Sequence, residues 1–226
     1  MAKRMKMDED KKIVLSLFDL SGVLVKPWAD AGYECHVVDL QHPSKMTVEG
    51  NVTKWGMDVY EWEEMFESAY PEKMKNVVFA AFFPPCTDLA VSGARWFAKK
   101  ERDNPGTRKR AMDLVFWSDR LGKKLNCPYF IENPVSVISS EWRPPDFTFH
   151  PYDYSGYEGG SNDGYTKKTC LWTGNGFSLP QKKPIKLDAK THDRIHKMGP
   201  SDERANMGSL TPMGYAQALF EKYSTK

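Results

Sequence analysis

Two short motifs place a thiol and a carboxyl group where buried strands are expected to end. Pro84-Pro85-Cys86 follows the apolar run 76–83, and Glu132-Asn133-Pro134 follows the apolar run 127–131. Both runs are apolar enough to be strands inside a parallel sheet. Ligands of open α/β sheets bind at the carboxyl ends of the strands, so Cys86 and Glu132 are expected to face one crevice. A nucleophilic thiol and a proton-donating carboxyl group in one crevice can add to an electron-poor ring.

Taken alone, a cysteine at a strand end is more often a small buried apolar residue than a nucleophile. The elements that surround Cys86 therefore decide how it is interpreted.

A strand, a turn of small residues, a helix and a second strand are predicted near the N-terminus. The run 13–18 stops at Asp19-Leu20-Ser21-Gly22, and the stretch 23–31 has helical spacing with Gly32 after it. The run 33–40 then reads as a strand that ends with Asp39. Such a turn is expected to offer backbone N–H groups at a helix N-terminus to a ligand, and Asp39 to accept hydrogen bonds from ribose hydroxyls.

Strand and helix patterns alternate through the first 135 residues. The stretch 60–69 is predicted to be a surface helix, and 108–125 a helix with an apolar inner face. Gly50-Asn51-Val52 is predicted to lie at a turn or at the tip of a third strand. This order predicts an α/β fold with a doubly wound, mostly parallel sheet.

The second half of the chain has a different character. Residues 137–200 are rich in Pro, Gly, Tyr and Asp, which predicts a loop-rich insertion that faces the substrate, with a short strand at 167–172. Residues 201–226 are predicted to return to the core through a final helix, with Thr211 as N-cap and Pro212 at its first position. We expect residues 1–12 to be flexible and residues 1–226 to form one catalytic domain.

The composition is that of an ordinary globular chain. The 226 residues are 40% hydrophobic and 27% charged, with a formal net charge of +2. The longest apolar stretch is about ten residues, below the roughly 20 that a membrane-spanning helix needs. We therefore expect a cytoplasmic monomer with no membrane partner.

Neither the four widely spaced cysteines nor the histidines suggest a metal centre. No C-x-x-C pair is present, so the cysteines are expected to be free thiols. His192 and His196 are spaced like two ligands on a helix, but with no third ligand nearby they are expected to lie on a polar helix face.

In their order along the chain, these motifs resemble those of the cytosine-C5 DNA methyltransferases, in particular the short, phage-like members. The resemblance covers nearly the whole chain. It is carried by Phe18 to Gly22, Asp39, Gly50-Asn51-Val52, Pro84-Pro85-Cys86, Glu132-Asn133-Pro134, residues 167–172, and Arg204 through Ala218.

The resemblance implies a fold, a methyl donor and a role for each motif. The fold is the Rossmann-like S-adenosylmethionine-dependent methyltransferase type, the partner is DNA with a flipped cytosine, and the location is the host cytoplasm if the protein is phage-encoded. Cys86 would add to C6 of cytosine, and Glu132 would hydrogen-bond N3. Donor-binding residues would be Phe18, Asp19, Leu20, Ser21, Gly22, Asp39, Asn51 and Pro84, and substrate-binding residues Pro85, Asn133, Pro134, Arg95, Lys167 and Lys168, with Arg143 as a further candidate for gripping DNA.

The chain departs from the family pattern at several positions. The donor turn reads Phe-Asp-Leu-Ser-Gly where the family usually has Phe-x-Gly-x-Gly, and no Gln-x-Arg-x-Arg motif is found, so Lys167-Lys168 is taken as its substitute. Only about thirty residues separate Trp172 from Arg204, too few for the target-recognition domain of the large family members. Low or short sequence specificity is the consequence we expect.

Two other functions remain open at this point. A pocket built for one flipped cytosine also suits a free cytosine nucleotide, which would agree with the small size and the near-neutral charge. A catalytically weak homologue that binds DNA or the donor would agree with the altered donor turn.

Overall fold

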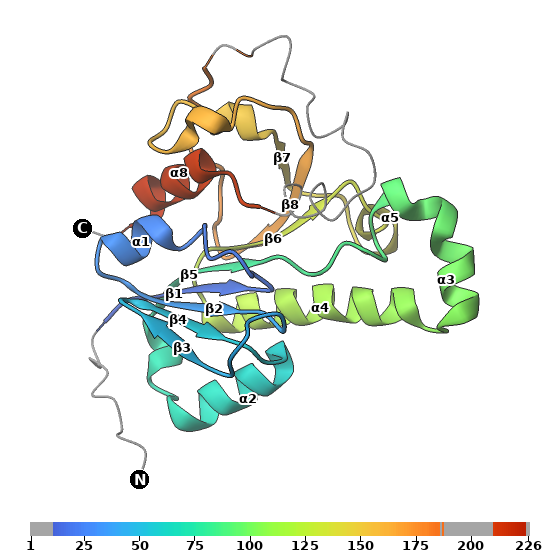
Figure 1. Cartoon of the computed structure of the whole chain (residues 1–226), viewed down its shortest axis with the longest axis horizontal. Coiled ribbons are helices and arrows are strands. Elements are labelled where there is room, and N and C mark those ends of the chain that lie inside the picture. The colour runs from blue at the N-terminus through green and yellow to red at the C-terminus, as the bar shows by residue number, and fades with distance from the viewer. Residues whose placement is uncertain (1–10, 186, 188–209, 225–226) are drawn as a thin grey trace.

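The sheet of this protein is mixed and has eight strands, with helices against both faces (Figure 1). It is seen in a computed structural model that describes residues 11–185, 187 and 210–224. The strands are β1 (Ile13–Leu17), β2 (Glu34–Val38), β3 (Thr47–Glu49), β4 (Val52–Trp55), β5 (Val77–Phe82), β6 (Tyr129–Pro134), β7 (Phe147–Phe149) and β8 (Thr169–Gly174). The helices are α1 (Lys26–Asp30), α2 (Val59–Ala69), α3 (Phe97–Asp103), α4 (Thr107–Leu125), α5 (Ile138–Glu141) and α8 (Met213–Tyr223), with 3-10 turns η1 (Lys73–Asn76), η2 (Val91–Trp96), η3 (Pro151–Tyr154) and η4 (Gly160–Asn162).

The strand order is β3-β4-β2-β1-β5-β6-β8-β7. Strands β4, β2, β1, β5 and β6 are parallel, whereas β3 and β8 run antiparallel to their neighbours at the two ends of this block. The chain moves outward from β1 to β2 and β4, and then returns to add β5 and β6 on the other side of β1. The α/β class predicted from the sequence is therefore confirmed, and the order reverses between β1 and β5.

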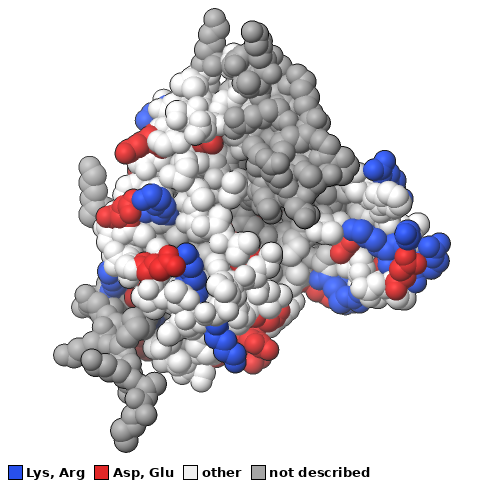
Figure 2. Space-filling model, in the orientation of Figure 1, with Lys and Arg blue, Asp and Glu red and all other residues white. Residues whose placement is uncertain are grey.

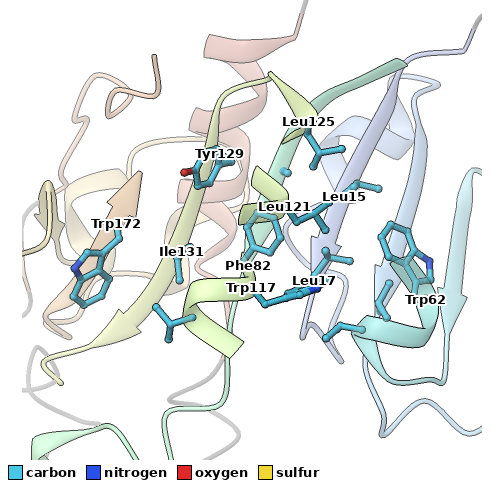
Figure 3. Packing of buried hydrophobic residues seen from close by; sticks show 14 of the residues in the cluster. Leu15, Leu17, Trp62, Phe82, Trp117, Leu121, Leu125, Tyr129, Ile131 and Trp172 are labelled. Carbon is cyan, nitrogen blue, oxygen red and sulfur yellow. The ribbon is translucent and has the colours of Figure 1, made fainter. Parts of the chain in front are cut away.

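Two apolar clusters, one on each face, hold the layers together. Along β1, Leu15 and Leu17 pack toward α2 and α4, and Val14 packs toward α1 and α8, because successive strand residues point to opposite faces. Figure 3 shows the first cluster, in which Trp117 and Leu121 of α4 lie over the sheet. Burial on both faces explains why these strands read as continuous apolar runs.

Several elements differ from the sequence prediction. The helix predicted at 23–31 is only α1, Lys26–Asp30. Strand β6 continues through Glu132, Asn133 and Pro134, since β8 pairs with these residues. The predicted surface helix at 60–69, α2, buries part of its length against the sheet.

The start of the last helix also differs. Pro212, rather than Thr211, occupies the N-cap position of α8. The N–H of Gly214 in the first turn donates instead to the Asp163 carboxylate at 2.8 Å. Asp163, which is distant in sequence, thus accepts from an N–H group at the start of α8, where the sequence predicted capping by Thr211.

The stretch predicted to be a loop-rich insertion supplies two strands to the sheet, β7 and β8, although 3-10 turns and irregular segments make up much of the rest. Within the described ranges, no helix has the length and apolar character needed to cross a membrane. The predictions for residues 1–10, for His192 and His196 and for 201–209 lie outside the described residues.

Candidate active site

The carboxyl ends of the parallel strands meet at one edge of the sheet. Leu17, the last residue of β1, pairs with Val38 at the end of β2 and with Phe82 at the end of β5. Phe82 pairs in turn with Ile131, which precedes Glu132 in β6. The residues that follow these positions therefore share one edge, and they include most of the predicted site residues: Phe18 to Gly22, Asp39, Pro84 to Cys86, and Glu132 to Pro134.

The turn after β1 is organised by the buried side chain of Asp19. Its Oδ1 accepts hydrogen bonds from the backbone N–H groups of Ser21 (2.8 Å) and Gly22 (2.9 Å) and from the Ser21 hydroxyl. The Ser16 hydroxyl donates to Oδ2 at 2.7 Å. The expectation that this turn offers free N–H groups at a helix N-terminus is wrong, because Asp19 already binds those N–H groups and α1 begins only at Lys26.

The backbone of Phe18 is unusual for a residue with a side chain. Its φ is 60°, in the left-handed region that favours glycine. Its ring contacts Trp117 edge-on, with centroids 5.8 Å apart, so packing against α4 holds this conformation. Strained backbone of this kind tends to collect at ligand-binding sites.

The loop after β2 brings a carboxylate and exposed apolar surface to the same edge. Asp39 lies at the end of β2, and its Oδ1 accepts a hydrogen bond from the N–H of Gln41 at 2.8 Å. Leu40 is 70% exposed, and Leu20 of the neighbouring turn is 47% exposed. His42 Nε2 lies 3.2 Å from the carbonyl oxygen of Asp19, which ties the two loops together. A carboxylate beside apolar surface suits the sugar and base of a nucleoside.

Asn51 is the one predicted donor-binding residue that does not reach this edge. It precedes β4, and because Val52 pairs with Cys35 near the start of β2, Asn51 lies at the amino ends of the parallel strands. Its side chain donates to the carbonyl oxygen of Ala29 at 2.9 Å and accepts from Lys11 at 2.7 Å. The predicted turn is present, as part of the β3–β4 hairpin, but Asn51 lies far from the other predicted donor-binding residues and is not included in the candidate donor site.

The loop that carries Cys86 is fixed to the neighbouring strand. The buried Asn133 side chain of β6 donates from Nδ2 to the carbonyl oxygen of Pro84 at 2.9 Å. The carbonyl oxygen of Cys86 accepts hydrogen bonds from the N–H groups of Leu89 and Ala90, which closes a tight turn. Asn133 is thus a positioning residue between the two motifs rather than an exposed substrate contact.

The charges around Cys86 act on its thiol in opposite directions. Cys86 is exposed to solvent, but the protein around it removes part of its hydration, and this is the main reason why the pKa of the thiol is raised above its ordinary value. The Glu132 carboxylate raises the pKa further, whereas the Lys167 and Lys100 ammonium groups lower it. Cys86, Glu132 and Lys167 therefore form one electrostatic group.

Lys167 forms an ion pair with Glu132. Its Nζ lies 3.6 Å from Oε1 of Glu132, and only about one sixth of each side chain is exposed, 16% and 17%. The next residue, Lys168, is exposed. The sequence gives no reason to distinguish Lys167 from Lys168. In the structure, Lys167 pairs with the Glu132 carboxylate, whereas Lys168 is exposed.

The other predicted substrate contacts lie at the surface. Pro85 and Arg95 are exposed, and Pro134 is half-buried at the end of β6. The Arg95 guanidinium lies over the Trp96 ring at 5.2 Å from its centroid. Arg143 instead forms an ion pair with Asp146 at 2.7 Å.

Two residues at this edge were missed by sequence reasoning. Lys100 donates to the carbonyl oxygen of Thr87 and to the Asp88 carboxylate, and so clamps the Cys86 loop from α3. Nothing in the local sequence distinguishes it from neighbouring lysines. Leu40 could have been found from the sequence. It directly follows Asp39 at the end of a predicted strand, where a polar loop residue would be expected.

A separate pocket in the described part of the chain lies away from Cys86 and Glu132. It has a volume of about 750 Å³ and lies between α3, the first half of α4 and Glu141 of α5, and it includes neither Cys86 nor Glu132. Its cations are already paired: Lys100 with Asp88, Arg108 with Glu141, and Lys109 with Asp113. This pocket is therefore not part of the group formed by Cys86, Glu132 and Lys167.

No protein-family model matches the chain, and a search of curated proteins finds no match.

Proposed function

We propose that this protein is an S-adenosylmethionine-dependent methyltransferase that acts on C5 of cytosine in DNA through a covalent bond between Cys86 and C6. The observation that carries the proposal is the grouping of Cys86, Glu132 and Lys167 at the carboxyl edge, beside the β1 turn. The strand order also supports a doubly wound sheet of the methyltransferase type, because strands are added on both sides of β1. Ligands of such sheets bind where the strand order reverses, which is between β1 and β5 in this protein.

The residues at the edge fit a nucleoside-containing donor. Asp39 offers a carboxylate for ribose hydroxyls, and Leu20 and Leu40 offer apolar surface for a base. Phe18 and Pro84 complete this side of the edge. Asp19, Ser21 and Gly22 contribute by holding the turn rather than by giving N–H groups to the donor. When bound, S-adenosylmethionine supplies an electrophilic methyl group on a sulfonium sulfur.

The chain's own residues account for activation of the base. Cytosine C5 is a weak nucleophile until a group adds to C6, so the Cys86 sulfur forms a bond to C6 and electron density moves toward C5 and N3. Lys167 favours the thiolate that must attack, against the raised pKa of Cys86. The Glu132 carboxyl group, when it carries a proton, donates a hydrogen bond to N3 and stabilises the charge that develops there. Methyl transfer to C5 would leave the donor as a neutral thioether. The C5 proton then passes to solvent water, its electron pair restores the C5–C6 double bond, and the C6–S bond breaks to return the Cys86 thiolate.

The choice between DNA and a free nucleotide depends on surface charge. Figure 2 shows basic and acidic side chains intermixed at the end of the molecule that carries α3, rather than a patch of one sign. DNA-binding surfaces are usually basic, because they neutralise phosphates. A free cytosine nucleotide, which needs no extended basic surface, is therefore the second candidate substrate.

Labelled S-adenosylmethionine tests the proposal directly. The parent protein is incubated with DNA or with dCMP, and we expect label in DNA cytosine at C5, within a short sequence context. Cys86→Ser should abolish transfer while leaving donor binding intact, and Asp39→Ala should weaken donor binding first. Cys127→Ser, at a buried thiol away from this edge, is the matched control and should keep activity.

Trapping on DNA that contains 5-fluorocytosine provides a second reading, because the fluorine prevents release of Cys86. A covalent complex is expected with the parent and not with Cys86→Ser. Label in dCMP alone would favour the second candidate. Activity that survives in Cys86→Ser would refute the covalent mechanism.

A further inference from the structure

Tyr215 of α8 is completely buried, yet its hydroxyl has no hydrogen-bond partner among the described residues. Its ring is held by an aromatic cluster: it stacks on Phe149 with centroids 4.2 Å apart and contacts Tyr154 at 4.9 Å. Phenylalanine would fill the same space without burying a polar atom. An unpaired buried hydroxyl costs free energy, so the hydroxyl needs a partner that the described residues do not supply.

Tyr215 and Glu132 line the same small pocket. Tyr215, Glu132 and Lys167 line it together, with Thr169 and Thr211 as further polar residues. The space suffices for about one water molecule. A water in this position would be surrounded by several polar side chains. Buried waters typically make about three hydrogen bonds, so these side chains could satisfy it.

The charge of Glu132 affects the pKa of the Tyr215 hydroxyl. Burial is the main cause that raises the pKa of Tyr215 well above its ordinary value, and the Glu132 carboxylate is among the neighbours that raise it further. Tyr215 therefore keeps its proton at neutral pH and can donate a hydrogen bond toward the carboxyl group.

We propose that Tyr215 is a positioning residue for Glu132 and acts through one buried water in this pocket, with Lys167 as the ion-pair partner of the same carboxyl group. The role of Glu132 in this inference rests on the proposed function. Through the water, α8 sets the orientation of a carboxyl group that must reach N3 of the base.

Tyr215→Phe removes the hydroxyl and keeps the ring. Tyr154→Phe is the matched control, because Tyr154 belongs to the same aromatic cluster but its hydroxyl is directed to the carbonyl oxygen of Pro180. For Tyr215→Phe we expect kcat to fall about tenfold with KM within about twofold, as for the loss of one hydrogen bond that matters in the transition state. Tyr154→Phe should leave both constants within about twofold of the parent.

Crystal structures of the parent and of Tyr215→Phe provide a reading that does not need activity. We expect one ordered water bonded to both the Tyr215 hydroxyl and the Glu132 carboxyl group in the parent, and a lost water and a displaced carboxyl group in the variant. A hydroxyl bonded to a protein atom, a dry pocket, or an unchanged Glu132 in the variant would overturn the inference. So would a parental kcat in Tyr215→Phe.

The two proposals fail separately. If the parent methylates no cytosine, the proposed function is wrong, and the crystal structures still decide whether Tyr215 positions Glu132. If the parent is active and Tyr215→Phe is kinetically indistinguishable from it, the positioning role is wrong and the methyltransferase proposal stands.

Discussion

Glu132→Gln and Lys167→Met should change the reactivity of the Cys86 thiol in opposite directions. In the folded protein, the Glu132 carboxylate raises the pKa of Cys86 and the Lys167 ammonium group lowers it. Removing the negative charge leaves the lysine unopposed, so the pKa should fall. Removing the positive charge should raise it. This outcome depends only on the geometry of the site and not on which substrate is bound.

The expected change in the pKa of Cys86 depends on how strongly solvent screens the charges of Glu132 and Lys167. Both side chains are mostly buried, but Cys86 is exposed, so solvent screens much of their influence on the thiol. A single screened charge of this kind contributes on the order of 0.5–1 kcal/mol, or roughly half a pH unit. Lower basicity also makes a thiolate a weaker nucleophile, which offsets about half of the gain in rate. At neutral pH we expect alkylation about twofold faster in Glu132→Gln and about twofold slower in Lys167→Met.

The assay is the rate of alkylation by iodoacetamide as a function of pH, with the modified cysteine identified by mass spectrometry. The other thiols are buried, and burial raises the pKa of Cys35 and of Cys127 to about 12, so they should react slowly. Lys168→Met removes an exposed charge next to Lys167 and should leave the Cys86 profile unchanged. If both test variants shift the profile in the same direction, or neither shifts it, the reasoning about this site is refuted.

Three further predictions concern the structure around the site. Asn133→Ala removes the bond to the Pro84 carbonyl and should lower the free energy of unfolding by about 1–3 kcal/mol, measured with urea; an unchanged value would show that this contact does not hold the loop. Glu34→Gln leaves the buried Lys73 ammonium without its counter-charge, and a loss of about 3 kcal/mol is expected in the same assay, with a neutral result contradicting the ion pair. The fold should also lose stability as the pH falls below about 6.5, because burial lowers the pKa of His36 and the unfolded chain binds the proton first; equal urea midpoints at pH 7.5 and 5.5 would contradict this.

Strands and long helices could be predicted because their signals are local. The apolar runs 13–18 and 76–83 became β1 and β5, and the pattern at 108–125 became α4. Asn51 shows the limit of this reasoning. Its turn was predicted, but the edge at which the turn lies depends on the direction of β4 relative to β2, and this direction is set by pairing between strands.

The sequence by itself determined which chemical groups are present and near which strand ends they lie. Cys86, Glu132 and Asp39 lie at or just after the ends of apolar runs, and the apolar composition of these runs predicts that they are buried strands. Only the tertiary structure decided which groups meet: Lys167 lies beside Glu132, Asn133 ties β6 to the Cys86 loop, and Tyr215 of the last helix lines the same pocket as Glu132. The reason is that side-chain neighbours across a sheet are set by strand order and register, which depend on residues far apart in the chain.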